Sequence, residues 1–162
     1  MQHQPSRPKN MIGRAEYVSF PEIDVIHIPA RIDTGAKTSA IWATDIREED
    51  GELSFYLFDE TSPHHKPLRH TMKEFDRIVV KSTIGQCEER YRVRLLLTLD
   101  GRLIRASFTL ANRSQQVYPV LIGRNVLKGK FIVDVELGEP RLEKQKAEQL
   151  RKQQLTNTRK AA

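Results

Sequence analysis

The sequence predicts an all-β protein: a closed barrel of six to eight strands, with one short helix and a helix-prone C-terminal tail. Three observations support this fold class. Apolar and polar residues alternate over several short runs, as in strands that bury one face. Asp-Gly pairs at 50–51 and 100–101 predict tight hairpin turns between such runs. The strands do not alternate with helical segments, so a parallel α/β sheet is disfavoured.

The N-terminal half begins with a predicted hairpin that turns at Pro21-Glu22. Its second strand carries apolar residues of one parity at Ile26, Ile28, Ala30 and Ile32, which predicts one buried face. A segment with two prolines and three histidines, 59–75, is predicted to be a surface loop. The strands predicted in this half are residues 15–20, 25–32, 39–46 and 52–58.

The C-terminal half contains the longest alternating run, in which Tyr91, Val93, Leu95, Leu97 and Leu99 share one parity. Residues 124–128 lie between two glycines and predict one helical turn. The strands predicted here are residues 77–81, 91–99, 103–110, 117–122 and 131–135. We expect a flexible N-terminal arm at 1–11, one domain at 12–138 and a basic C-terminal tail at 139–162.

Charge and composition narrow the possible partners. The chain has 162 residues and a net charge of +6. Residues 141–162 carry +5 and residues 1–14 carry +3, which leaves −2 on the body. The basic ends therefore favour anions non-specifically, and nucleic acid is disfavoured as the main partner. A lone Cys87 and the lack of a long apolar run indicate a soluble cytoplasmic protein without a membrane segment.

Asp33-Thr34-Gly35 is the strongest chemical signal, because it places one carboxylate in a tight turn directly after a strand. Two carboxylates that share one proton can activate a water and polarise a peptide carbonyl. The sequence contains Asp-Thr-Gly once. The second carboxylate must therefore come from another copy of the chain, which makes a two-fold homodimer a requirement of this chemistry.

The eleven residues from Ala30 to Ala40 resemble the active-site motif of retropepsin-like aspartic peptidases. The segment 120–127, Val-Leu-Ile-Gly-Arg-Asn-Val-Leu, is similar to the second motif of that family, an apolar-apolar-glycine stretch before a short helix. The segments at 82–90 and 123–131 are similar to a bacterial RimB-like group, long named ATP-dependent zinc proteases and linked to the RimK glutamate ligase. The resemblance covers about residues 12 to 137.

The resemblance implies an acid-protease barrel, a homodimer and a peptide or protein substrate. It implies that Asp33 is catalytic, that Thr34 braces the turns across the two-fold axis, and that Gly35 allows close approach of the substrate. The supporting residues behind the turn would be Leu121, Ile122 and Gly123. The segment 82–89 could be the flap over the substrate or an ordinary hairpin turn. The candidate substrate-binding residues are Ala36, Lys37, Ile84, Gly85 and Arg124.

Lys37 departs from the retropepsin pattern, which has acidic residues directly after Asp-Thr-Gly-Ala. Arg124 then lacks its expected acidic partner. One interpretation is that Lys37 and Arg124 bind a carboxylate of an acidic or glutamate-modified peptide. The other is that Lys37 is solvated and Arg124 pairs with another acid, such as Asp134.

No cofactor or metal is expected. The chain contains neither a His-Glu-x-x-His motif nor a phosphate-binding P-loop, and His64, His65 and His70 fall in the predicted surface loop. Three functions remain open at this point. The first is an aspartic endopeptidase with a functional link to a glutamate ligase. The others are a non-catalytic peptide- or partner-binding module of the same fold and a basic-tailed RNA-binding β-barrel.

Overall fold

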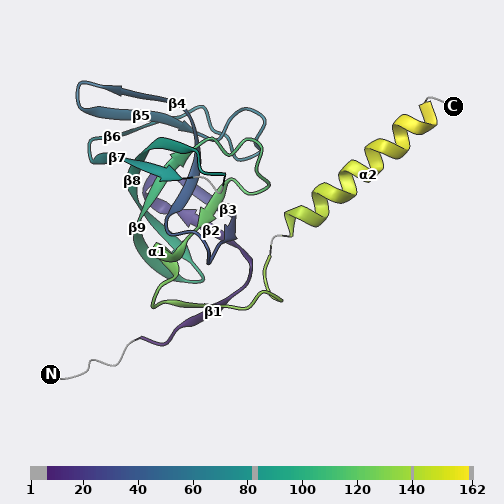
Figure 1. Ribbon diagram of the computed structural model, residues 1–162, viewed down its shortest axis with the longest axis horizontal. Helices are drawn as coiled ribbons and strands as arrows, with labels where there is room; N and C mark the ends of the chain where they lie inside the picture. The colour runs from purple at the N-terminus through teal and green to yellow at the C-terminus, as the bar shows by residue number, and fades with distance from the viewer. Residues whose placement is uncertain (1–6, 82–83, 140, 161–162) are drawn as a thin grey trace.

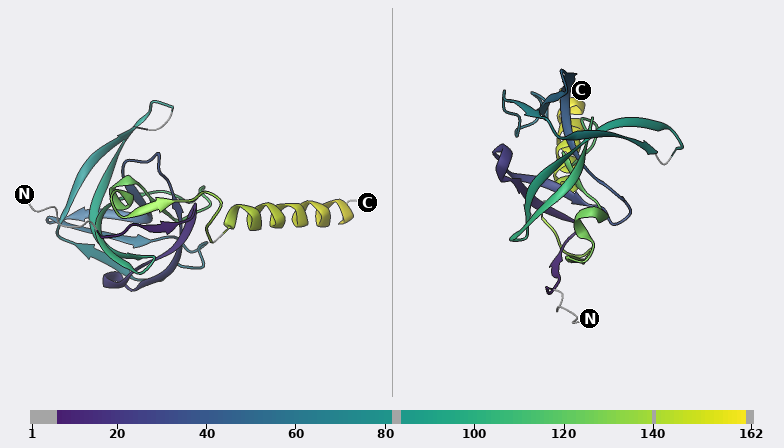
Figure 2. Two further views of the ribbon diagram at one scale, coloured as in Figure 1. Left: turned by 90° about the horizontal axis from the view of Figure 1, so that it is seen from below. Right: turned by 90° about the vertical axis from the view of Figure 1, so that its left-hand side faces the viewer.

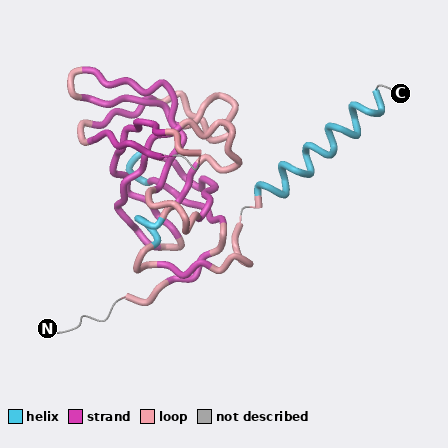
Figure 3. Tube along the Cα trace, viewed as in Figure 1, coloured by secondary structure: helices cyan, strands magenta, loops and turns pink. Residues whose placement is uncertain are grey.

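The computed structural model describes residues 7–81, 84–139 and 141–160, and Figures 1 and 3 show a strand-rich body from which one helix projects. The strands are β1 (Asn10–Ile12), β2 (Ala15–Phe20), β3 (Val25–Ile32), β4 (Ser39–Glu49), β5 (Glu52–Leu57), β6 (Arg69–Met72), β7 (Phe75–Lys81), β8 (Cys87–Leu99), β9 (Arg102–Ala111), β10 (Val120–Ile122) and β11 (Phe131–Val133). The helices are a 3-10 turn, η1 (Pro21–Ile23), the short α1 (Arg124–Leu127) and the C-terminal α2 (Leu142–Lys160).

Six strands pair in a closed ring, in the order β10-β3-β2-β8-β9-β4 and back to β10. Two of the pairings, β10 with β3 and β4 with β9, are parallel, and the others in the ring are antiparallel. The parallel pairing of β10 with β3 joins segments about 90 residues apart in the chain. It places the two motifs of the sequence side by side.

The centre of the ring is apolar, as the alternating patterns predict. On β8, Val93, Leu95, Leu97 and Leu99 are buried while Arg94 is exposed. Phe20 from β2 and Phe108 from β9 meet edge to face at 5.3 Å in the core. Burial of these side chains stabilises the ring by roughly 1.5–3 kcal/mol each.

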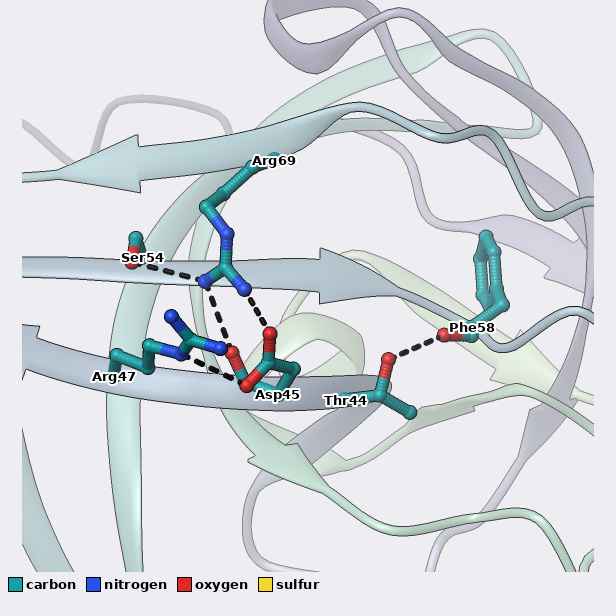
Figure 4. A network of polar contacts seen from close by, with 6 residues as sticks. All are labelled: Thr44, Asp45, Arg47, Ser54, Phe58 and Arg69. Carbon is teal, nitrogen blue, oxygen red and sulfur yellow. Dashed lines mark hydrogen bonds and ion pairs between the residues drawn. The ribbon is translucent and has the colours of Figure 1, made fainter.

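Two hairpins extend beyond the ring. β7 pairs with the first half of β8 from Phe75↔Val93 to Lys81↔Cys87, and this arm rises above the ring in Figure 2. β5 and β6 continue the sheet from the far end of β4. The β4–β5 pairing shifts register between Thr44 and Arg47, where Asp45 has φ 47°. Figure 4 shows the Asp45 carboxylate bound there by the Arg47 and Arg69 guanidinium groups.

The predicted surface loop 59–75 is wrong in part, because residues 69–72 form strand β6 and pair with β5. The residues of β6, Arg-His-Thr-Met, do not alternate between apolar and polar side chains, so this strand becomes apparent only from its pairing with β5. The predicted burial of Ile26 is also wrong, since this side chain is 65% exposed. The β2–β3 pairing shifts register between Val18 and Phe20, and on the β3 side His27 has φ 56°. This irregularity changes which side chains of β3 point into the core, so Val25 is buried in place of Ile26.

A separate two-stranded sheet, in which β1 pairs with β11, lies below the ring in Figure 1. β1 and β11 form a parallel two-stranded sheet, and Gly13 and Gly138 touch so closely that a Cβ on Gly13 would meet Gly138 at 2.3 Å. From there α2 extends away from the body (Figures 1 and 2). None of the helices formed by the described residues is both long and apolar enough to cross a membrane.

Candidate active site

Asp33 lies in the turn between β3 and β4, and backbone hydrogen bonds on both sides fix the entry to this turn. The Asp33 amide donates to Ile122 O at 2.9 Å, and the Ile32 amide donates to Arg14 O at 2.9 Å. The Asp33 Oδ1 atom accepts from the amides of Gly35 at 2.9 Å and Ala36 at 3.2 Å. The carboxylate is half-buried, and these two donors set its orientation.

The strand β10 supports the turn from behind. Its register places Leu121 beside Arg31 and Ile122 beside Ile32, and Ile122 is fully buried. Gly123 follows at a crowded point, where a Cβ would come within 2.6 Å of Thr38 O and 2.9 Å of Ala36 O. Glycine is therefore required here by close packing of backbone on backbone.

A buried hydroxyl joins β4, β10 and α1. The Ser39 Oγ atom accepts from the Gly123 amide at 2.9 Å and donates to Asn125 Oδ1 at 2.7 Å. The Asn125 amide group donates in turn to Ser107 O on β9 at 2.8 Å. This network satisfies a buried hydroxyl and locks α1 against the ring. Sequence reasoning missed Ser39 and Asn125, although both fall within the two resembling segments.

Arg124 reaches back over the Asp33 turn. Its Nη1 donates to Gly35 O at 2.9 Å and to Thr34 O at 3.3 Å, and its amide donates to Ala36 O at 2.8 Å. The structure therefore unites Asp33, Thr34, Gly35, Ala36, Ile122, Gly123 and Arg124 in one cluster.

The predicted alternative partner of Arg124 is not seen: across the described residues no ion pair joins Arg124 to Asp134, whose Oδ1 accepts from the Glu136 amide. Lys37 is exposed, and within 7–81, 84–139 and 141–160 it has no ion pair either. Two cations close to the Asp33 turn thus lack a carboxylate partner in the described chain.

The candidate flap corresponds to the end of the β7–β8 arm. Of the predicted segment 82–89, residues 82 and 83 lie outside the described residues. Ile84 is 78% exposed and Gly85 has φ 81°, so both belong to a turn rather than to the ring. Residues 87–89 continue into β8. No hydrogen bond between described residues joins Ile84 or Gly85 to the Asp33 turn.

Arg113, in the loop between β9 and β10, is a residue that sequence reasoning missed. Its Nε donates to Tyr118 O at 2.9 Å. Burial and the nearby Arg90 charge lower the pKa of Arg113 to about 10, with Arg31 adding to this and Asp33 opposing it. The loop sequence around Arg113 has no periodicity or motif that would have identified it.

The described histidines, at 27, 64, 65 and 70, show no metal site. Burial, with smaller effects of His27 and Lys66 respectively, lowers the pKa of His64 and of His70. In the part of the chain that the structure describes, no group of three or more His, Cys, Asp or Glu side chains is placed to hold a metal ion.

A closed strand ring that carries an Asp-Thr-Gly turn, backed by an apolar-apolar-glycine strand and a short helix, defines the class of retropepsin-like aspartic peptidases. Comparison with known families agrees with this class. The chain belongs to the RimB-like family, described as "Retropepsin-like aspartic endopeptidase RimB", whose model matches residues 11–144.

Relatives among curated proteins are much longer than this chain. The chain is 37% identical over 130 residues to proteins named "Probable alpha-L-glutamate ligase" from Shewanella halifaxensis and Shewanella pealeana, and 33% identical over 133 residues to one from Desulfotalea psychrophila. These matches cover 78–80% of this chain but only 28–29% of the relatives.

The crystal structure of the Legionella pneumophila protein Lpg0085, of unknown function (DUF785), shares the fold. It matches with a TM-score of 0.60 and 24% identity, covering 81% of this chain and 97% of that chain.

Proposed function

We propose that this protein is an aspartic endopeptidase that acts as a homodimer, with one Asp33 from each copy. The observation that carries this proposal is the Asp33 carboxylate, which the Gly35 and Ala36 amides hold in one orientation at the edge of the ring. Because each chain supplies a single Asp-Thr-Gly, the catalytic pair is completed only across a two-fold axis.

The chemistry follows from the proximity of the two carboxylates. At about 3 Å and an effective dielectric of about 20, two carboxylate charges repel by roughly 5 kcal/mol, so one of them keeps a proton. The ionised carboxylate then takes a proton from a water that attacks the peptide carbonyl. The protonated one donates its proton to the carbonyl oxygen, which gives a tetrahedral intermediate. When the C–N bond breaks, the carboxyl group that took the proton from water gives it to the amine nitrogen, and the other carboxylate takes back a proton from a hydroxyl of the intermediate, which restores the starting pair.

An exposed apolar surface supports the dimer. Met11, Ile132, Val135 and Leu137 are 58%, 51%, 73% and 46% exposed, and all four lie on or directly after the β1–β11 sheet. This surface is close to the Asp33 turn, because the Arg14 amide donates to Leu137 O while Arg14 O accepts from the Ile32 amide. A second copy that covers this sheet would bring the two Asp33 turns near each other.

The substrate we propose is an acidic or glutamate-modified peptide. Lys37 and Arg124, without carboxylate partners in the described chain, offer positive charge next to Asp33. The relatives named probable alpha-L-glutamate ligases contain a segment similar to this chain, which supports a functional link between this peptidase and glutamate ligation.

The test compares the protein with its Asp33→Asn variant. We expect the wild type to cleave glutamate-containing peptides and Asp33→Asn to lose cleavage while sedimentation shows the same dimer mass. Asp24→Asn, a change at an exposed aspartate outside the turn, is the matched control. Cleavage that survives in Asp33→Asn would refute the catalytic assignment, and a monomeric active protein would refute the shared pair.

A further inference from the structure

The Glu143 carboxylate, in the first turn of α2, lies in a cluster of hydrogen-bond donors on the body of the protein. The Arg31 Nη1 atom donates to Glu143 Oε1 at 3.1 Å. The Tyr118 hydroxyl donates to Glu143 Oε2 at 2.7 Å, and the Arg14 Nη1 atom donates to the same oxygen at 3.5 Å. Two guanidinium groups and a hydroxyl thus engage both oxygens of one carboxylate. These contacts define a site that accepts a glutamate side chain.

This site lies beside the Asp33 turn. Arg31 precedes Asp33 by two positions, and the Ile32 side chain between them is buried. Because successive side chains of an extended strand point to opposite faces, Arg31 and Asp33 emerge on the same face, about 7 Å apart along the chain. Arg14 is joined to the same segment, since its carbonyl oxygen accepts from the Ile32 amide at 2.9 Å. A carboxylate in this site would therefore be about two residues from the scissile bond of a peptide bound at Asp33.

The three donors belong to the body, and a ligand can reach them. Tyr118 is 2% exposed, and its backbone oxygen accepts from Arg113 Nε at 2.9 Å, so packing and a hydrogen bond fix its position. The side chains of Arg14 and Arg31 are 37% and 54% exposed. The site therefore combines a fixed hydroxyl with two guanidinium groups that are open to solvent.

Glu143 is an occupant that another carboxylate can displace. Its side chain is 36% exposed, and ion pairs this exposed contribute little to stability. Residues 144–156 of α2 are exposed, and the helix leads away from the body (Figure 1). A carboxylate from another molecule would thus compete with Glu143 for the same donors.

We propose that Arg14, Arg31 and Tyr118 form a subsite for a glutamate side chain of the substrate, and that Glu143 occupies this subsite until the substrate displaces it. The subsite distinguishes Glu from Gln, because an amide brings no charge and turns a donor of its own toward the guanidinium groups. It rests on the proposed peptidase function, since Asp33 defines where the scissile bond lies. If Glu143 were only an anchor of α2, its removal would not strengthen peptide binding.

Peptide binding in an inactive background tests the subsite without relying on catalysis. Fluorescence anisotropy of the full chain carrying Asp33→Asn would measure the affinity of labelled peptides with Glu or Gln at one position at a time. We expect one position at which Glu binds roughly 10-fold or more tighter than Gln. Adding Glu143→Gln vacates the subsite and should tighten binding of that Glu peptide by about 3- to 10-fold, with little change for the Gln peptide.

Changes to the donors should have the opposite effect. Arg31→Gln should reduce the Glu-to-Gln ratio to about threefold or less, and Tyr118→Phe should lower it by a smaller factor, because only a hydroxyl is lost. Arg94→Gln, at an exposed arginine on β8, is the matched control and should leave the ratio unchanged. Glu148→Gln makes the same change as Glu143→Gln at an exposed position further along α2 and should leave the affinity unaltered.

Arg14→Gln supplies a second probe should Arg31→Gln fail to fold. A Glu preference that survives in both arginine variants would overturn the subsite, as would the lack of a Glu preference at every position. A Glu143→Gln variant that binds the Glu peptide no more tightly than its parent would refute the displacement. Failure of the peptidase proposal is distinguishable, since it would appear as a wild-type protein that prefers Glu peptides in binding but cleaves neither Glu nor Gln peptides.

Discussion

The Arg124 guanidinium donates to the carbonyl oxygen of Gly35 at 2.9 Å, so the first residue of α1 clasps the turn that carries Asp33. Arg124 also donates to Thr34 O and thus bonds two successive backbone carbonyls of the turn. It acts on the turn as a brace and leaves its charge without a carboxylate partner in the described chain.

Replacing Arg124 by Ala should disorder this turn more than it destabilises the fold. We expect a loss of about 1 kcal/mol in the free energy of unfolding, because the two hydrogen bonds are solvent-accessible. Peptidase activity should fall by roughly 10-fold or more, since small displacements of catalytic groups are costly. Chemical denaturation and peptide cleavage measure the two effects, with Lys128→Ala, an exposed cation at the end of α1, as the control. Equal loss in both variants would contradict the brace.

Gly123→Ala should destabilise the protein through a steric clash. The added methyl group would meet Thr38 O at 2.6 Å and Ala36 O at 2.9 Å, both backbone atoms of the Asp33 loop. We expect a cost of about 1–3 kcal/mol in the free energy of unfolding. Gly51→Ala is the informative comparison, because φ is 74° there but the space is open. Its cost should be about 1–2 kcal/mol, from the left-handed backbone alone, and a larger loss of stability in Gly51→Ala than in Gly123→Ala would argue against crowding at Gly123.

The attachment of α2 should depend on acid pH. Glu143 in its first turn accepts from the Tyr118 hydroxyl at 2.7 Å and pairs with Arg31 and Arg14. Burial raises the pKa of Glu143, but the Tyr118 hydrogen bond and the two arginines outweigh it and leave the pKa below 4.5. Burial and Glu143 raise the pKa of Tyr118 to about 12.

Because the Glu143 pKa is depressed in the folded state, its contribution is complete above pH 4.5 and is lost as pH falls through the folded pKa. Hydrogen exchange of the first turn of α2, corrected for intrinsic rates, should accelerate at pH 3.5 relative to pH 6. Glu143→Gln should show the faster exchange at both pH values, whereas Glu148→Gln should behave as the wild type. Exchange that is independent of pH would contradict the attachment.

Lys37→Glu should weaken a preference for acidic peptides, because the change replaces an exposed cation four residues after Asp33 by an anion next to the substrate. The ratio of cleavage rates for Glu and Gln peptides measures this. Lys128→Glu makes the same change in charge away from the turn and should leave the ratio near its original value. An unaltered ratio in Lys37→Glu would remove Lys37 from substrate recognition.

Val135→Glu should convert the proposed dimer into monomers. The side chain is 73% exposed beside the β1–β11 sheet, and a charge there would have to be desolvated in the interface. Sedimentation should show half the mass, and activity should fall with it. Val79→Glu, at a valine 64% exposed on β7, controls for the charge itself. Dimers that persist in Val135→Glu would place the interface elsewhere.

Much of the fold could be predicted from local patterns. The β2–β3 hairpin, the long alternation of β8 and the Asp100-Gly101 turn into β9 were all predicted and are confirmed. Predictions failed where the neighbouring chain decides the outcome. β6 is a strand because its backbone pairs with the edge of β5. Ile26 is exposed because a bulge in the β2–β3 pairing changes which side chains of β3 point into the core. Neither effect leaves a periodic signal in the sequence.

The sequence by itself determined where the candidate site lies and which family the chain belongs to, through a single Asp33-Thr34-Gly35 turn and a second motif ending at Gly123-Arg124. Only the tertiary structure decided how they act together. The parallel pairing of β10 with β3 brings Gly123 against Thr38 and lets Arg124 clasp Gly35. No local pattern shows these contacts, because contacts between distant segments depend on how strands pair and not on the residues of either segment alone.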